Sequence, residues 1–234
     1  MPTSSIFDSA RQKIQRAKQH AVEFSSMEQN YLKQACSGIV TEVETNGGEQ
    51  VVKLKFSKPV PIEIPSVVSD AANNLRDSLD HIGYAAAQAA KKGSNPKHTT
   101  FPFAASAAQL ENSINGRAKD IPADILTLFR NLRPYKGGDE QLYALNTIAN
   151  ANKHQMLRPM AVSTGTFNLS LGKVSGGMVG IPQFAWRPDK NEIILFRCGK
   201  ETAVDISSIS VQVFLVFDEP PSMPVIRWVG FLMC

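Results

Sequence analysis

The residues best suited to do chemistry lie in one short segment, NNLRDSLDH, at positions 73–81. Arg76 and His81 stand five positions apart there, with Asp77 and Asp80 between them. Arginine binds anionic groups through paired hydrogen bonds, and histidine takes up or releases a proton near neutral pH. These residue types therefore predict anion binding or proton transfer, provided that the surrounding elements bring them together.

The apolar pattern around this segment predicts a helix. At roughly 100° per residue, Leu75, Leu79 and Ile82 fall on one side of that helix. The opposite side gathers the polar residues Asn73, Arg76, Asp77, Asp80 and Tyr84, and Asn74 and His81 lie on one flank of it. Arg76 and Asp80 are four positions apart and can form an ion pair. Arg76 and His81 lie about 140° apart on an ideal helix, so both reach one cleft only if that cleft spans the whole polar side.

A second helical segment, LNTIANANKHQML, carries a comparable polar stripe. Asn146, Asn150 and His154 follow one another at steps of four and lie on one face, with Lys153 beside them. Asparagine is unfavourable inside a helix, so these positions indicate tertiary hydrogen bonds or a function. We expect the two polar stripes to face each other across a shared, solvent-filled cleft.

A structural interpretation and a metal site are the alternatives at this cleft. In the first, Arg76 pairs with Asp80, a histidine bonds to an asparagine amide, and the network fixes the helix register. In the second, Asp80 and His81 bind a metal together with His98 and His154, although the spacing has no HxH or HExxH pattern. We expect no cofactor and no bound metal.

The elements that must position these residues indicate an α+β fold. An apolar stripe from Phe7 to Phe24 predicts a first helix, and further helices are expected from about 66 to 93, 104 to 115, 122 to 131 and 139 to 157. From about 160 the chain has the alternation and turn signals of antiparallel strands. We therefore predict a mainly helical region, 1–158, and an antiparallel β region, 159–234, which packs with the helices as one unit.

A β-hairpin interrupts the helices near residues 38–57. The stretch GIVTEVETNGGEQVVKLKF alternates with a period of two and is predicted to turn at Gly47-Gly48. That turn places Val43 opposite Val52 and Glu42 opposite Lys53, and it puts Val43 on the same face as Val52 and Leu54. We expect the hairpin to join the sheet of the C-terminal region.

Composition and charge exclude several classes of protein. The chain has 234 residues, 43% hydrophobic and 20% charged, with a net charge of +4 and no dense Lys/Arg run. This composition excludes a disordered chain and permits, without demanding, an acidic partner such as RNA. Its three cysteines lack the spacing of a disulfide framework or zinc site. Without a signal-peptide pattern or an apolar run near ~18 residues, we expect a cytoplasmic protein with no membrane partner.

The segment RDSLDH resembles the short signature of the HEPN superfamily of small helical ribonucleases. The resemblance implies a metal-independent enzyme in which two such helices, one from each copy of a homodimer, line an RNA cleft. It implies that Arg76 holds the scissile phosphate, that His81 moves the proton, and that Asp77 is the polar residue of the signature. Substrate-orienting or supporting roles would fall to Asn73, Asn74, Asp80, Asn146, Asn150, Lys153 and His154.

A longer part of the chain resembles a widespread uncharacterised bacterial family. Its members have NLRxxLDH followed later by LNxxxNxDKHRxL, and this chain has NLRDSLDH and LNTIANANKHQML. Asn152 stands where the family has Asp, and Gln155 where it has Arg. The resemblance implies the order of the elements and a strand-rich C-terminal third, but no function.

These observations lead to one predicted function and two alternatives. The predicted function is a HEPN-like endoribonuclease of the type found in toxin or defence systems, with RNA and a second copy of the chain as partners. The first alternative is a non-enzymatic structural or partner-binding protein whose polar helix cluster is a buried network. The second is a metal-assisted hydrolase.

Overall fold

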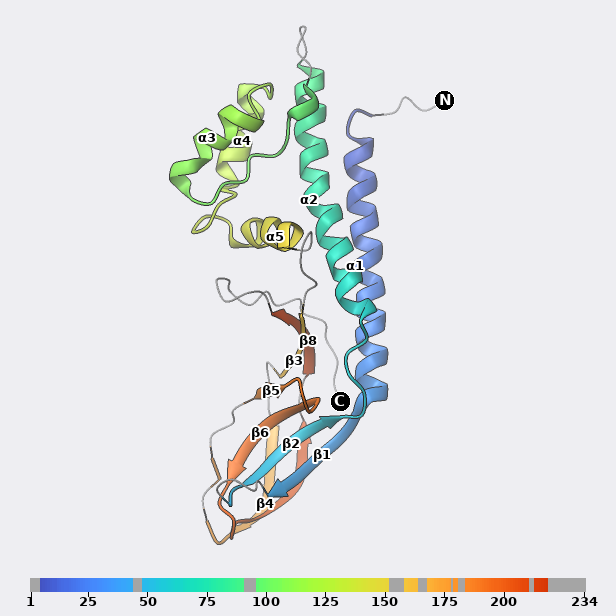
Figure 1. Cartoon of the computed structure of the whole chain (residues 1–234), viewed down its shortest axis with the longest axis vertical. Coiled ribbons are helices and arrows are strands. Elements are labelled where there is room, and N and C mark those ends of the chain that lie inside the picture. Colours follow the sequence, from blue (N-terminus) through green and yellow to red (C-terminus); the bar gives the residue numbers. More distant parts are fainter. Residues whose placement is uncertain are drawn as a thin grey trace. The chain divides into compact units, whose positions relative to one another are not determined.

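The computed structural model describes residues 5–43, 48–90, 96–151, 158–163, 168–177, 179–180, 184–210 and 213–218. The fold is α+β, as predicted, and these residues form five α-helices and antiparallel strands (Figure 1). The chain divides into two compact units, and neither is continuous in sequence. Unit 1 combines Met1–Glu23 with Ser66–Leu157, and unit 2 combines Phe24–Pro65 with Arg158–Cys234. That both regions pack as one unit stays a prediction.

The helices of unit 1 follow the apolar patterns of the sequence. They are α1, of which the part up to Glu23 lies in this unit, α2 from Ser66 onward, α3, α4 and α5, with bounds Asp8–Ala35, Glu63–Ala89, Ala107–Arg117, Ala123–Asn131 and Glu140–Ala151. Helix α2 begins three residues before the predicted start at 66. Pro65 lies in its first turn, where the missing N–H of proline is not needed.

An aromatic cluster forms the core of unit 1. The Phe101 ring lies 4.8 Å from that of Phe103 and 4.7 Å from that of Phe129, measured between centroids. The loop that carries Phe101 runs close to α2 at Gly83, where an added Cβ would lie 3.3 Å from Ile121 Cδ1 and 3.6 Å from the Thr100 carbonyl carbon. A Cβ at Gly83 would thus be in ordinary contact with the loop and would press only against the end of the Ile121 side chain.

Unit 2 contains a four-stranded antiparallel sheet and two further strand pairs. The sheet has the order β1-β2-β6-β5, with bounds Cys36–Val43, Gln50–Phe56, Glu192–Cys198 and Ala185–Arg187. The early hairpin thus pairs with a late strand, as expected. The two pairs are β3 with β8 and β4 with β7, with bounds Arg158–Ser163, Val213–Asp218, Asn168–Ser175 and Ala203–Ser210.

The predicted register of the hairpin is wrong by two residues. Val43 lies opposite Gln50, and Glu42 lies opposite Val51 instead of Lys53. A shift of two leaves every side chain on its predicted face, because the side-chain period of a strand is two. In the observed register Glu42 lies diagonal to Lys53 and forms ion pairs with both Lys53 and Lys55.

The part of α1 that belongs to unit 2 packs against these strands. The Tyr31 ring stacks on Phe56 at 6.1 Å, and Trp186 meets Phe56 edge-on at 5.7 Å. Glu28, which is buried, accepts a hydrogen bond of 2.7 Å from the backbone N–H of Leu215 in β8. Burial raises the pKa of the Glu28 carboxyl above its ordinary value, and this hydrogen bond opposes the rise only in part.

Candidate functional site

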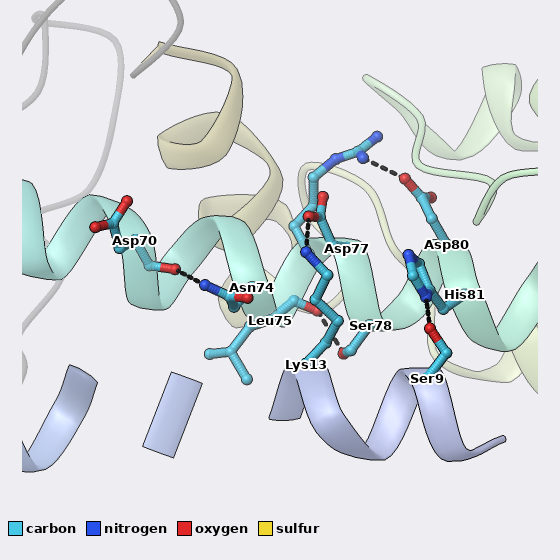
Figure 2. A network of polar contacts seen from close by, with 10 residues as sticks. Ser9, Lys13, Asp70, Asn74, Leu75, Asp77, Ser78, Asp80 and His81 are labelled. Atoms are coloured by element: carbon cyan, nitrogen blue, oxygen red, sulfur yellow. Dashed lines mark hydrogen bonds and ion pairs between the residues drawn. The ribbon is translucent and has the colours of Figure 1, made fainter. Parts of the chain in front are cut away.

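The polar residues of α2 divide between two neighbours within unit 1 (Figure 2). In Figure 2 the side chain of His81 reaches Ser9 on α1, and Lys13 of α1 reaches Asp77, whereas Asp80 points away from α1. The segment predicted to form one polar side thus contacts two separate neighbours, α1 and the loop that carries Phe101.

Two contacts join α2 to α1. Ser9 Oγ lies 2.5 Å from His81 Nδ1, and Lys13 Nζ lies 2.9 Å from Asp77 Oδ2. The two contacts are four residues apart on each helix and run in opposite directions along the chain. The two helices are therefore antiparallel, and the two contacts between them lie about one helical turn apart.

A different contact joins α2 to the loop that carries Phe101. Arg76 forms an ion pair with Asp80, and each side chain is only 17% exposed. The second carboxylate oxygen of Asp80, Oδ1, accepts a 2.9 Å hydrogen bond from the backbone N–H of Phe101. The Arg76 guanidinium carbon also lies 5.9 Å from the centre of the Phe103 ring, within the range of a cation–π contact.

The Arg76–Asp80 ion pair predicted from the spacing is present, and Arg76 and His81 contact different neighbours. Arg76 is held at the Phe101–Phe103 loop, and His81 is held at α1. Among the described residues, Nε of Arg76 is buried without a hydrogen-bond partner, so this contact incompletely satisfies the guanidinium.

The other residues predicted to support the site lie on α2, on α5 or outside the described residues. Asn74 Nδ2 donates to the backbone carbonyl of Asp70 at 2.8 Å, which is a contact within α2, and Asn73 is half-buried on the same helix. Asn150 and Asn146 contact each other on α5 at 3.3 Å. Lys153 and His154 lie outside the described residues, so the predicted approach of the two polar stripes stays a prediction.

Sequence reasoning missed the α1 side of the network. Ser9 and Lys13 belong to a stretch that resembles an ordinary solvated helix face, and their partners lie 72 and 64 residues away. The available signal was complementary residue types at matching four-residue steps in two helices. That signal becomes informative only when the two helices are known to be neighbours.

A second polar cluster crosses the four-stranded sheet of unit 2. Lys53 Nζ lies 2.5 Å from Glu42 and 2.9 Å from Glu192, and the side chains of Lys53 and Glu192 are 5% and 2% exposed. Arg187 reaches Glu192 at 3.4 Å, and Lys55 contacts Glu42. The cluster therefore places acidic and basic side chains in alternation from β1 to β5.

The electrostatics of this cluster favour the charged forms of Glu42 and Lys53. Hydrogen bonds from Lys53 and then from Lys55 lower the pKa of Glu42 to about 2. Burial alone would lower the pKa of Lys53, but the bonds to Glu42 and Glu192 outweigh it and raise this pKa above its ordinary value. Groups held charged in this way suit a structural network better than proton transfer near neutral pH.

No family model, no curated protein and no solved structure matches this chain. Both resemblances drawn from the sequence therefore stay predictions. Within the described ranges, no group of three or more His, Cys, Asp or Glu side chains could hold a metal ion. In the same part of the chain, no helix has the length and apolar character needed to span a bilayer.

Proposed function

We propose that this chain is a non-enzymatic, partner-binding protein in which the polar residues of α2 serve its architecture. The observation that carries the proposal is the separation of Arg76 from His81. Arg76 is engaged by Asp80 and Phe103, and His81 is engaged by Ser9 on α1. Two groups that act on one phosphate must reach the same atom, and in a single chain these two are directed to different neighbours.

The bonds of Asp80 explain why Arg76 is not readily available to a substrate. If Arg76 turned toward a phosphate, Asp80 would keep its bond to the Phe101 N–H but lose its cation while only 17% exposed. A largely buried polar group left without its partner costs about 1–3 kcal/mol, and more when it is charged. Substrate binding would have to overcome this cost before any catalysis.

The second candidate is a HEPN-like ribonuclease that completes its site between two chains. The RDSLDH segment favours it, and so does one feature of the histidine: among the described residues, Nε2 of His81 has no hydrogen-bond partner. That nitrogen could serve a substrate if a second copy brought its own Arg76 to the same phosphate. Metal would not be needed.

The two candidates are separated by an RNA cleavage assay. The wild-type protein, Arg76→Ala, His81→Ala and the control Arg16→Ala, which changes an exposed arginine of α1, are incubated with single-stranded RNA in the presence of a chelator. The proposal predicts no cleavage above buffer by the wild type, or equal trace cleavage by all four proteins from a contaminant.

The ribonuclease candidate predicts a different result. A ribonuclease would lose roughly 100-fold or more of its activity in Arg76→Ala and in His81→Ala, while Arg16→Ala kept its activity. Circular dichroism would have to show that both inactive variants are folded. That outcome would replace the proposed function with the second candidate.

A further inference from the structure

The contact between Ser9 and His81 joins a hydroxyl group to a base. Ser9 Oγ lies 2.5 Å from His81 Nδ1, and Figure 2 shows the two side chains meeting between α1 and α2. Ser9 is exposed and His81 is half-buried, so a reagent in solution can reach the serine oxygen. A serine hydroxyl becomes an effective nucleophile when a base within hydrogen-bond reach takes its proton.

The imidazole of His81 can act as that base through Nδ1. A neutral histidine ring carries one hydrogen, so Nδ1 accepts the Ser9 proton when the ring hydrogen is on Nε2. Histidine takes up and releases protons near neutral pH, which makes it the commonest base in such a pair. The contact therefore has the two groups that the first step of a serine-based acyl transfer needs.

The place of Ser9 in its helix supports the same chemistry. Ser9 is the second residue of α1. The N–H groups in the first turn of a helix have no acceptor within that helix, and the helix dipole adds partial positive charge there. Both favour a negative charge that develops beside the serine, such as the oxyanion of a tetrahedral intermediate.

A second contact holds the two side chains at this distance. Lys13 Nζ lies 2.9 Å from Asp77 Oδ2, one helical turn along α1 from Ser9 and one turn along α2 from His81. This ion pair limits the sliding of the two helices past each other. The hydroxyl and the base are thus placed before any reagent arrives, which lowers the entropic cost of reaction.

The charges beside the pair restrict the class of reagent. Asp8 precedes Ser9 in the chain, and Asp77 stands one turn before His81. Each of these carboxylates already pairs with a cation of α1. Two carboxylates so close disfavour a doubly charged phosphoryl donor, whereas an uncharged carbonyl carbon meets no such repulsion.

We propose that Ser9 is a nucleophilic serine, activated by His81, which accepts an acyl group from an activated ester. The Ser9 oxygen attacks the carbonyl carbon while its proton passes to His81 Nδ1. The bond from that carbon to the leaving group then breaks, and its electron pair departs with the leaving group. The product is an ester of Ser9, and the imidazolium returns its proton to the leaving group or to water.

This inference goes beyond the proposed partner-binding function, since it requires one covalent modification and no turnover. Incubation of the full chain with p-nitrophenyl acetate tests it, with the acetylation of each serine followed by mass spectrometry of its peptides. The matched control is Ser66, an exposed serine in the first turn of α2. Ser9 should be acetylated roughly 10-fold faster than Ser66, or more. Equal rates at the two serines overturn the inference.

Two further measurements assign the reactivity to the pair. His81→Gln can still bond to Ser9 but cannot take its proton, so acetylation of Ser9 should fall roughly 10-fold or more while that of Ser66 is unchanged. Circular dichroism checks that the variant is folded. Wild type in concentrated urea should lose the difference between the two serines, because the contact between α1 and α2 is lost. Unchanged acetylation in His81→Gln, or a difference that persists in urea, overturns the inference. Neither outcome depends on RNA cleavage, so the two proposals fail separately.

Discussion

At the scale of single residues, Asp80 shows how one side chain holds two elements in place. One carboxylate oxygen bonds to Arg76 on its own helix, and the other bonds to the backbone N–H of Phe101 in the packed loop. The spacing of Arg76 and Asp80 made the first bond predictable, because residues four apart on a helix are neighbours. The second bond was not predictable, because nothing local in the sequence marks the Phe101 amide as a donor without a backbone partner.

Glu28 carries a prediction at the same scale. Its raised pKa means that ionisation of the folded protein is disfavoured. The contribution of Glu28 to the stability of the folded protein is thus fully present below pH 4.5, the ordinary pKa of this carboxyl. It is lost as the pH rises through the raised pKa of the folded state. Glu28→Gln keeps an acceptor for the Leu215 N–H but cannot ionise. The free energy of unfolding of this variant should therefore increase relative to that of the wild type as the pH rises above 4.5.

Urea unfolding of the wild type and variants between roughly pH 4 and pH 8 measures this difference. Glu28→Ala leaves the Leu215 N–H without its acceptor and should be less stable than Glu28→Gln by about 1–3 kcal/mol at every pH. Gln29→Ala, an exposed change next in the helix, should stay within about 0.5 kcal/mol of the wild type. A difference between Glu28→Gln and the wild type that does not change with pH would show that Glu28 is not the group responsible.

At the scale of elements, the row of acidic and basic side chains across the four-stranded sheet was the feature least predictable from the sequence. Alternation in the hairpin predicted which face each side chain takes, and that prediction holds. It did not specify the register, because registers that differ by two residues satisfy the same alternation. It also gave no sign that Lys53 would be buried against Glu192, a residue of a strand far along the chain.

Removal of Lys53 is expected to be costly, and removal of the whole pair much less so. Lys53→Met leaves Glu192 buried without this partner, and breaking a buried ion pair costs about 3–5 kcal/mol. The double variant Lys53→Met with Glu192→Met replaces the pair by apolar side chains and should recover most of that loss. Arg187 and Glu42, the other partners, are more exposed and can turn toward water.

Chemical denaturation of the two single variants and the double variant measures this recovery. Lys55→Met is the matched control, since Lys55 also contacts Glu42 but is 37% exposed, and it should cost less than about 1 kcal/mol. Should the double variant be as unstable as the sum of the single changes, the pair would not be the stabilising unit described above.

At the scale of the whole molecule, the chain passes between its two units three times. The boundaries fall between residues 23 and 24, 65 and 66, and 157 and 158, and the first lies inside the uninterrupted helix α1. No change of composition or periodicity marks that point, because the apolar stripe of a helix continues whichever partner it packs against. The predicted division of the sequence near 158 rested on the change from helical to strand patterns, which is a local signal.

We propose that Arg76 and Asp80 stabilise the folded chain and are not held in place for a reaction. A double-mutant cycle on the free energy of unfolding tests it most directly, with the wild type, Arg76→Ala, Asp80→Ala and both changes together. We predict that each single change costs about 1–3 kcal/mol, more for Asp80, and that the double change costs less than their sum. Residues kept for catalysis commonly cost stability. Single variants as stable as the wild type, or more stable, would therefore contradict the account.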